Sequence, residues 1–424
     1  MKIPSLRFLP FAFLAFFSGL YSVMAQDVSA LLIKTLGFSN EWVGYSSILI
    51  LPWSINFLVG PWVDRGNPRV MVAVIQSLAI MLLCVLSWAL WIGWSLHVIL
   101  GLLLLLACVG AFYETINNAL YLKTFDISDQ AYFSGFKAGF LRLGLVLGGG
   151  ILIQGIGYWQ NGHSVAYGWM IYFLIIGVMF LLSLPLLNAL LKTIPISIPR
   201  NSSSHSFFHS ISLYFRQKEI VLFIFFLLLF RFGEGISMRL VIPFYLDLPT
   251  QNGLGLSVKE VGFLKGVVSL ISSVLGGLGG GWLISKKGLR SSFLLLALCM
   301  ILPNIFYVYM ALVLPTGVLQ IAGLPSFHFW ALIAVIIEYL GYGMGFAALF
   351  NFVCQRTDPE HAATHFSISA AIWNLGLLLP GMISGKLQST LGYPLTFICS
   401  IAFSIPGLFL IFYMRHRMKE AFPR

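Results

Sequence analysis

The chain alternates between long apolar stretches and short polar connections. Twelve of the apolar stretches have about 20 residues or more, the length that an α-helix needs to cross a bilayer. They lie at approximately 8–34, 41–62, 69–91, 97–122, 130–158, 167–191, 218–247, 258–284, 290–314, 326–354, 361–389 and 393–414. The stretches lack the alternation of a membrane β-barrel, and open strands cannot span lipid. The pattern therefore predicts an all-α polytopic membrane protein with twelve transmembrane helices.

The composition agrees with this class of protein. Of the 424 residues, 59% are hydrophobic and only 9% are charged, against about 25% charged residues in an average soluble domain. An ordinary cytosolic enzyme, a disordered chain and a nucleic-acid-binding domain are therefore excluded, despite the net charge of +11. The lipid bilayer is the expected partner, and nucleic acid is not.

The cysteine pattern gives no sign of a metal site or a disulfide. The five cysteines lie within or at the edges of apolar stretches, without a CxxC pair or a His/Cys cluster. We expect them to pack as small hydrophobic residues. Because the glycine clusters lie inside hydrophobic helices and no Walker motif occurs, we expect no cofactor and no ATP hydrolysis.

The basic residues predict the orientation of the spans. With the N-terminus placed in the cytoplasm, seventeen Lys and Arg residues fall on the inside, and only Lys34, Lys259 and Lys386 fall on the outside. This bias predicts a multi-pass inner-membrane protein with both termini in the cytoplasm. The first span also resembles a cleavable leader, but its apolar stretch continues past Asp27, which favours a retained helix.

A polar linker and an internal repeat divide the sequence into two halves. The predicted organisation is a six-helix bundle at 1–192, a cytoplasmic linker at 193–217 and a second six-helix bundle at 218–424. Residues 36–44 read LGFSNEWVG, and residues 254–262 read LGLSVKEVG. Because similar segments precede a span in each half, we expect two similar bundles related by an axis along the membrane normal.

This arrangement resembles the major facilitator superfamily. The loop between the second and third spans carries a family-like set of residues, namely Gly60, Asp64, Arg65, Gly66 and Arg69. The resemblance implies the twelve-helix major facilitator fold and a loop that ties helix ends together by charge and latches one conformation. The alternative is that these residues are only positive-inside anchors with a turn glycine.

Several spans resemble the AmpG-type muropeptide permeases within that superfamily. The segments that carry the resemblance are Tyr113–Ala119, Phe140–Gly149, Phe230–Glu234, Glu260–Lys265, and Glu338 with Gly343–Gly345. Asn118 stands where the pattern has a second acid, and Asn56 stands where it has a lysine. The resemblance implies transport of an anhydro-muropeptide, while relatives in the same branch carry siderophores or acetyl-CoA.

Nine ionisable residues lie at membrane depth, and they are the strongest functional signal in the sequence. They are Asp27, Glu114, Lys137, Arg142, Arg231, Glu234, Arg239, Lys265 and Glu338. An Asp, Lys or Arg at the centre of a membrane helix costs about 2.5–3.5 kcal/mol on insertion scales, so these side chains must face a polar cavity or one another. We expect Lys137 to snorkel to the inside surface and Arg239 to reach the outside interface.

Both halves supply candidates for binding an anionic solute. Arg142 lies in the middle of its span without an acid nearby in sequence, and a guanidinium can bind a carboxylate bidentately. A bridge from Arg142 to Glu114 or Asp27 is the alternative. The substrate-binding candidates are Arg142, Arg231, Lys265, Asn56 and Asn118.

Four carboxylates are candidates for proton coupling. Arg231 and Glu234 are three residues apart and can pair on one helix face. Protonation of Glu234 would then free Arg231, whereas the alternative is a self-neutralising pair that only lets the helix insert. Glu338 has no base nearby in its own span, and Lys265 or Arg231 is its expected partner. The proton-coupling candidates are Glu234, Glu338, Asp27 and Glu114.

These observations favour a monomeric secondary active transporter that moves a small-molecule anionic solute together with protons. An anhydro-muropeptide is the favoured substrate, and a ferric siderophore is the alternative within the same class. An intramembrane transferase is the alternative from another class, but no His-Asp or Asp-Asp pair lies in an interface loop. A non-transporting receptor would leave nine charges in the membrane without a purpose. No catalytic residue is therefore assigned.

Overall fold

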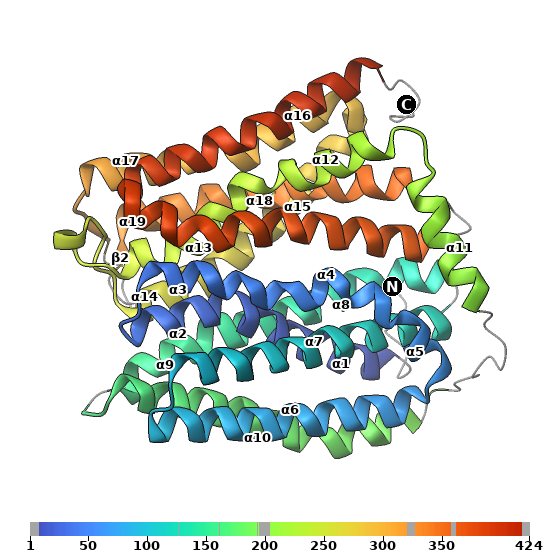
Figure 1. The fold of residues 1–424 in the computed structure, drawn as a ribbon, viewed down its shortest axis with the longest axis horizontal. Helices are drawn as coiled ribbons and strands as arrows, with labels where there is room; N and C mark the ends of the chain where they lie inside the picture. The colour runs from blue at the N-terminus through green and yellow to red at the C-terminus, as the bar shows by residue number, and fades with distance from the viewer. Residues whose placement is uncertain are drawn as a thin grey trace. The chain divides into compact units, whose positions relative to one another are not determined.

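The computed structural model describes residues 8–125, 127–160, 162–192, 194, 204–319, 327–357 and 362–417, and helices make up nearly all of them (Figure 1). Eleven helical segments in these ranges are long and apolar enough to cross a membrane. The last, Thr364–Met414, has 51 residues, about 75 Å of helix, against about 30 Å of bilayer core. Gly392, with φ 74°, breaks its helical backbone. The segment is therefore two spans, and the predicted twelve-helix fold is confirmed.

The first half of the chain forms six spans, several of which contain short irregular segments. Its helices, with η2 and η5 π-helical and η3 and η4 of 3₁₀ type, are α1 (Leu9–Val23), η2 (Met24–Val28), α2 (Ser29–Thr35), α3 (Asn40–Tyr45), η3 (Ser46–Ile50), α4 (Leu51–Ile55), η4 (Asn56–Val59), α5 (Gly60–Arg65), α6 (Pro68–Ile92), α7 (Leu96–Thr124), α8 (Ile127–Val146), η5 (Leu147–Ile151), α9 (Leu152–Trp159) and α10 (Val165–Lys192).

The second half contains the other six spans and one small hairpin. Its elements, with η6 of 3₁₀ type and η7 π-helical, are α11 (Ser204–Phe215), α12 (Ile220–Phe230), α13 (Phe232–Leu246), η6 (Pro249–Gln251), α14 (Val258–Phe263), η7 (Leu264–Val268), α15 (Ser269–Lys287), α16 (Leu289–Ile301), α17 (Asn304–Val313), β1 (Val318–Leu319), β2 (Phe327–His328), α18 (Phe329–Arg356) and α19 (Ala362–Arg417). β1 and β2 pair antiparallel.

The chain folds into two compact units. One contains residues 1–36 and 55–207, and the other contains residues 37–54 and 208–424. Residues 37–54 thus pack with the second unit, although the repeat places them in the first half of the sequence. The boundaries at 1–192, 193–217 and 218–424 remain predictions.

In the first unit, glycines let α1 and α8 approach to backbone contact. A Cβ atom on Gly144 would lie 2.0 Å from the carbonyl oxygen of Phe16, and one on Gly19 would lie 2.1 Å from that of Leu141. No larger side chain fits at either position without moving a helix. The glycines of α1 and α8 therefore form a packing surface, as small residues commonly do in membrane helices.

In the second unit, a similar contact joins α15 and α18. A Cβ atom on Gly276 would lie 2.1 Å from the carbonyl oxygen of Leu340, and one on Gly343 would lie 2.2 Å from that of Ser273. Both helices contribute a glycine, so their backbones meet directly. This packing fixes the position of α18, which carries Glu338.

The irregular segments follow the internal repeat. The offset that aligns Leu36 with Leu254 also aligns η3, at Ser46–Ile50, with η7, at Leu264–Val268. The α-helix is therefore interrupted at the same place in both repeats. Because such interruptions occur often at functional sites, these segments direct attention to the side chains that they carry.

Candidate functional site

Three of the predicted membrane charges lie where the helices are irregular. Asp27 lies in the π-helical segment η2, and Lys265 lies in η7. Arg231 lies between α12 and α13, with φ −102° and ψ 5°. A single-span helix would run through each of these positions. The irregularities therefore coincide with ionisable side chains, as in many functional sites.

Arg231 and Glu234 form the ion pair that their spacing predicts. Arg231 Nε donates to Glu234 Oε2 at 2.8 Å, and Arg231 Nη2 donates to Glu234 Oε1 at 2.5 Å. Their side chains are 5% and 18% exposed. The guanidinium also lies 5.9 Å from the ring centre of Tyr342 and 5.8 Å from that of Phe346. The pair is bidentate and mostly buried, and the two rings stabilise its cation further.

Glu338 lies in a cluster of tyrosines within the second unit. The hydroxyl of Tyr307 donates to the Glu338 carboxylate, and the hydroxyls of Tyr307 and Tyr245 are 3.3 Å apart. Lys265 Nζ donates to the hydroxyl of Tyr339 at 2.8 Å. Glu338 thus has a hydroxyl partner from α17, which the sequence did not predict.

In the first unit, Lys137 joins α8 to α7. Its Nζ donates to Asn118 Oδ1 at 2.6 Å and lies 4.6 Å from the ring centre of Tyr121. Glu114 also acts on Lys137 electrostatically. A side-chain amide and an aromatic ring thus contact the ammonium group of Lys137 between two helices. Its snorkelling to the inside surface stays a prediction.

Three other candidates of the first unit make no such contacts. Asp27, Arg142 and Asn56 are half-buried. Within the described ranges, none of the three makes a side-chain hydrogen bond or an ion pair. A bridge from Arg142 to Glu114 or Asp27 is therefore absent from this part of the chain. The guanidinium of Arg142 keeps its full capacity to bind an anion.

The loop predicted to act as a latch is tied to the segment that follows α10. Arg69 Nη2 donates to the carbonyl oxygen of Ile194 at 2.8 Å. A Cβ atom on Gly66 would lie 2.3 Å from Met71 Sδ, so the loop packs closely over that side chain. Gly60 lies at the start of α5. Asp64 and Arg65 also lie in α5, and their side chains are outside the described part of the structure. The latch itself remains a prediction.

A buried polar cluster in the second unit joins α3 to α13 and α19. Asn40 Nδ2 lies 2.9 Å from both Gln388 Oε1 and the Tyr393 hydroxyl, and 3.5 Å from Asp247 Oδ2. The hydroxyl of Tyr393 donates to Asp247 Oδ2 at 2.5 Å. Asn40 is 9% exposed and Asp247 is 8% exposed. We call these four residues the clasp.

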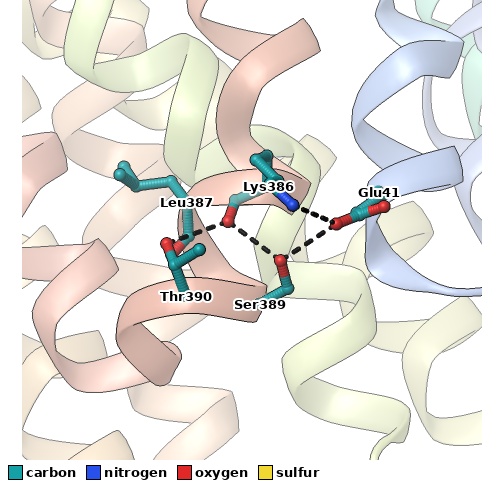
Figure 2. Close-up of polar contacts among 5 residues, drawn as sticks. All are labelled: Glu41, Lys386, Leu387, Ser389 and Thr390. Carbon is teal, nitrogen blue, oxygen red and sulfur yellow. Dashed lines mark hydrogen bonds and ion pairs between the residues drawn. The ribbon is translucent and has the colours of Figure 1, made fainter.

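An exposed rim and a glycine contact extend the clasp. Figure 2 shows Lys386 and Ser389 of α19 pointing toward Glu41 of α3, with distances to its Oε1 of 3.4 and 3.1 Å. The Lys386 side chain is 65% exposed, so this ion pair contributes little to stability. At the residue before Lys386, a Cβ atom on Gly385 would lie only 1.9 Å from the carbonyl oxygen of Asn40. Close backbone packing and buried hydrogen bonds therefore hold α3 in place.

Comparison with known proteins identifies the family. A model of the Major Facilitator Superfamily matches residues 6–379, which is most of the chain. The chain belongs to this superfamily. It is therefore a multi-pass membrane transporter of small solutes, and not an enzyme.

The relatives of this transporter include muropeptide permeases. It is 20% identical over 414 residues to the anhydromuropeptide permease of Escherichia coli K12, covering 96% of this chain and 79% of that protein. It is 22% identical over 421 residues to an uncharacterised protein of Haemophilus influenzae, covering 96% and 94%. A solved bacterial homologue of the lysosomal transporter Spinster, in an inward-facing conformation, matches over 100% of both chains with TM-score 0.74 and 14% identity. The similarity to the Spinster homologue shows the fold alone.

The structure of the transporter also corrects and extends the set of candidate residues. Arg239 is 2% exposed, and its Nη1 lies 3.4 Å from Ser46 Oγ. It does not reach the outside interface as predicted, because its side chain is buried in the second unit beside Ser46. Asp247 and Tyr307 were missed. The repeat marks the partner of Asp247, because Asn40 lies in the repeated segment LGFSNEWVG and contacts Asp247.

Proposed function

We propose that this transporter is a proton-coupled importer of an anionic solute such as an anhydro-muropeptide. It works in the inner membrane by alternating access, with both termini in the cytoplasm. The buried ion pair of Arg231 and Glu234, at the break between α12 and α13, carries the proposal. The muropeptide permease among the relatives supports the choice of substrate, because it covers nearly the whole chain.

The geometry of the pair supports a switch. With Glu234 ionised, both of its oxygens accept from Arg231, so the guanidinium is neutralised within its own helix. Protonation of Glu234 removes the charge that opposes Arg231. The guanidinium then becomes available to a carboxylate of the solute, and solute binding and proton binding favour each other.

Arg142 is the candidate cation of the first unit for binding an anionic solute. It is half-buried and makes no side-chain hydrogen bond or ion pair with any other residue in the described ranges. An uncompensated arginine at membrane depth is costly, and an anionic solute would offset that cost.

Alternating access also requires the ends of the transporter to open and close in turn. The charge bias puts the clasp at the outer end and the loop of Arg69 at the inner end. We infer that the clasp holds α3 against α13 and α19 at the outer end, and that its hydrogen bonds exchange with water when α3 moves. Its rim of exposed charges makes this exchange easier, because the rim contributes little to stability.

The coupling is tested with purified transporter in liposomes that contain or lack labelled anhydro-muropeptide. Glu234→Gln and Glu338→Gln are expected to lose accumulation driven by an inward proton gradient and to keep solute exchange at equal pH. Each amide keeps the approximate size of the carboxylate but cannot bind or release the coupled proton.

Glu219→Gln is the matched control for this experiment. Glu219 is exposed and precedes α12, so its loss removes one carboxylate from outside the span. The control is expected to accumulate solute at the wild-type rate. Wild-type accumulation in both Glu234→Gln and Glu338→Gln would contradict the proposed coupling.

A further inference from the structure

Glu338 reaches its hydroxyl partner through a fully buried pair of tyrosines. Tyr307 and Tyr245 are both 0% exposed, and they come from α17 and α13. Tyr307 stacks on Phe397 of α19 with ring centres 5.3 Å apart. Packing therefore fixes the ring of Tyr307, and its hydroxyl approaches Glu338 from a rigid support.

The hydrogen bonds in this group have a direction. A tyrosine hydroxyl has one hydrogen to donate, and Tyr307 donates it to Glu338. The 3.3 Å contact between Tyr245 and Tyr307 is then a bond that Tyr245 donates and Tyr307 accepts. The order of donation is Tyr245 to Tyr307 to Glu338. Each bond polarises the next, so the second hydroxyl strengthens the first.

We propose that Tyr307, supported by Tyr245, is a positioning residue that holds the Glu338 carboxylate and sets the pH at which Glu338 takes up a proton. A hydroxyl that donates to a carboxylate stabilises its charged form. Loss of the hydroxyl therefore favours the protonated form, and Glu338 would bind its proton at higher pH. The inference rests on the proposed coupling role of Glu338.

In the described part of the chain, charged and titratable groups also lie on the elements that surround Glu338. Lys265 of η7 and Tyr339 of α18 act electrostatically on Tyr245, as does Glu338 itself. The ammonium group of Lys265 is bonded to Tyr339. From α16, Cys299 contacts α18 through its backbone carbonyl, beside Gly341. On α19, the hydroxyl of Tyr393 donates to Asp247.

The experiment is an infrared pH titration of the purified transporter, which follows the carbonyl band of protonated carboxyl groups. Glu338→Gln identifies the band that belongs to Glu338. We expect Tyr307→Phe to move the midpoint of that band upward by about one to two pH units. This shift corresponds to the free energy of one hydrogen bond to a charged group. Tyr245→Phe is expected to move it in the same direction by less.

Tyr172→Phe is the matched control. Tyr172 is also 0% exposed, and its hydroxyl donates to the carbonyl oxygen of Gly148 at 3.0 Å. The control loses a buried hydrogen bond of similar kind in the other unit, so it is expected to leave the midpoint unchanged. A merely structural role for Tyr307 would make the two tyrosine variants behave alike.

Two outcomes overturn the inference. The first is a Glu338 band with the wild-type midpoint in Tyr307→Phe. The second is a spectrum in which Glu338→Gln removes no titrating band. If Tyr307→Phe does not fold, an unmoved midpoint in Tyr245→Phe overturns it in the same way. Because the titration needs no solute, failure of wild-type protein to take up muropeptide would contradict the proposed substrate and leave this result standing.

Discussion

Replacement of one glycine tests how α3 is held in the second unit. Gly385→Ala adds a Cβ atom 1.9 Å from the carbonyl oxygen of Asn40, which is backbone and cannot rotate away. Ordinary carbon–oxygen contacts lie at about 3.3 Å or more. Helix α3 must therefore withdraw from α19 by about 1.4 Å, or the hydrogen bonds of the clasp must lengthen by a similar amount.

We expect Gly385→Ala to destabilise the transporter by about 1–3 kcal/mol, the usual cost of forcing an extra group into a packed site. Gly281→Ala is the matched control. Gly281 lies in α15 of the same unit and has no atom within 4 Å of an added Cβ. The same substitution there should be neutral or stabilise by up to about 1 kcal/mol, because alanine favours a helix more than glycine does.

The assay combines thermal unfolding in detergent with labelling of one buried position. Ser47 is 0% exposed and lies against Gly381, where an added Cβ would come within 2.4 Å of its hydroxyl. In a background without the native cysteines, Ser47→Cys should react slowly with a maleimide, and faster when Gly385→Ala is added. Equal stability of the two alanine variants, with Ser47→Cys still protected, would refute the described packing.

Substitutions of three arginines test the charged groups. Arg231→Met should destabilise the protein by about 3–5 kcal/mol because it leaves Glu234 uncompensated. Adding Glu234→Gln should restore part of the lost stability in thermal unfolding. A double variant as unstable as the single one would contradict the pairing. Arg142→Lys should weaken solute binding at least about tenfold, because the charge remains but the bidentate fork is lost, whereas wild-type affinity would assign Arg142 a structural role. Arg69→Ala should lower stability by about 1–3 kcal/mol by removing the bond to Ile194, and an unchanged melting temperature would show that this tie is not needed.

The spans could be predicted from the sequence because each depends on its own composition. A helix that crosses lipid must satisfy its backbone internally and present apolar side chains, and both requirements are local. The predicted stretch at 69–91 therefore agrees with Pro68–Ile92 of the structure. The pair of Arg231 and Glu234 could be predicted for the same reason, since the two residues are three positions apart on one helix face.

Contacts between distant segments could not be predicted in this way. Arg239 was expected at the outside interface because its distance from the end of its span suggests snorkelling. It is covered instead by Ser46, from a segment that the repeat assigns to the other half. Tyr307 is one of 16 tyrosines, and nothing local marks it as the partner of Glu338. Which hydroxyl meets a membrane carboxylate depends on how α13, α17 and α18 pack.

The central claim is proton-driven import of an anionic muropeptide, and uptake by cells that lack their own carriers tests it most directly. Cells that express the transporter would receive labelled anhydro-muropeptide or a labelled ferric siderophore, with and without an uncoupler. The account predicts accumulation of the muropeptide that the uncoupler abolishes, and none of the siderophore. Accumulation that survives the uncoupler would contradict proton coupling, and accumulation of the siderophore alone would contradict the substrate.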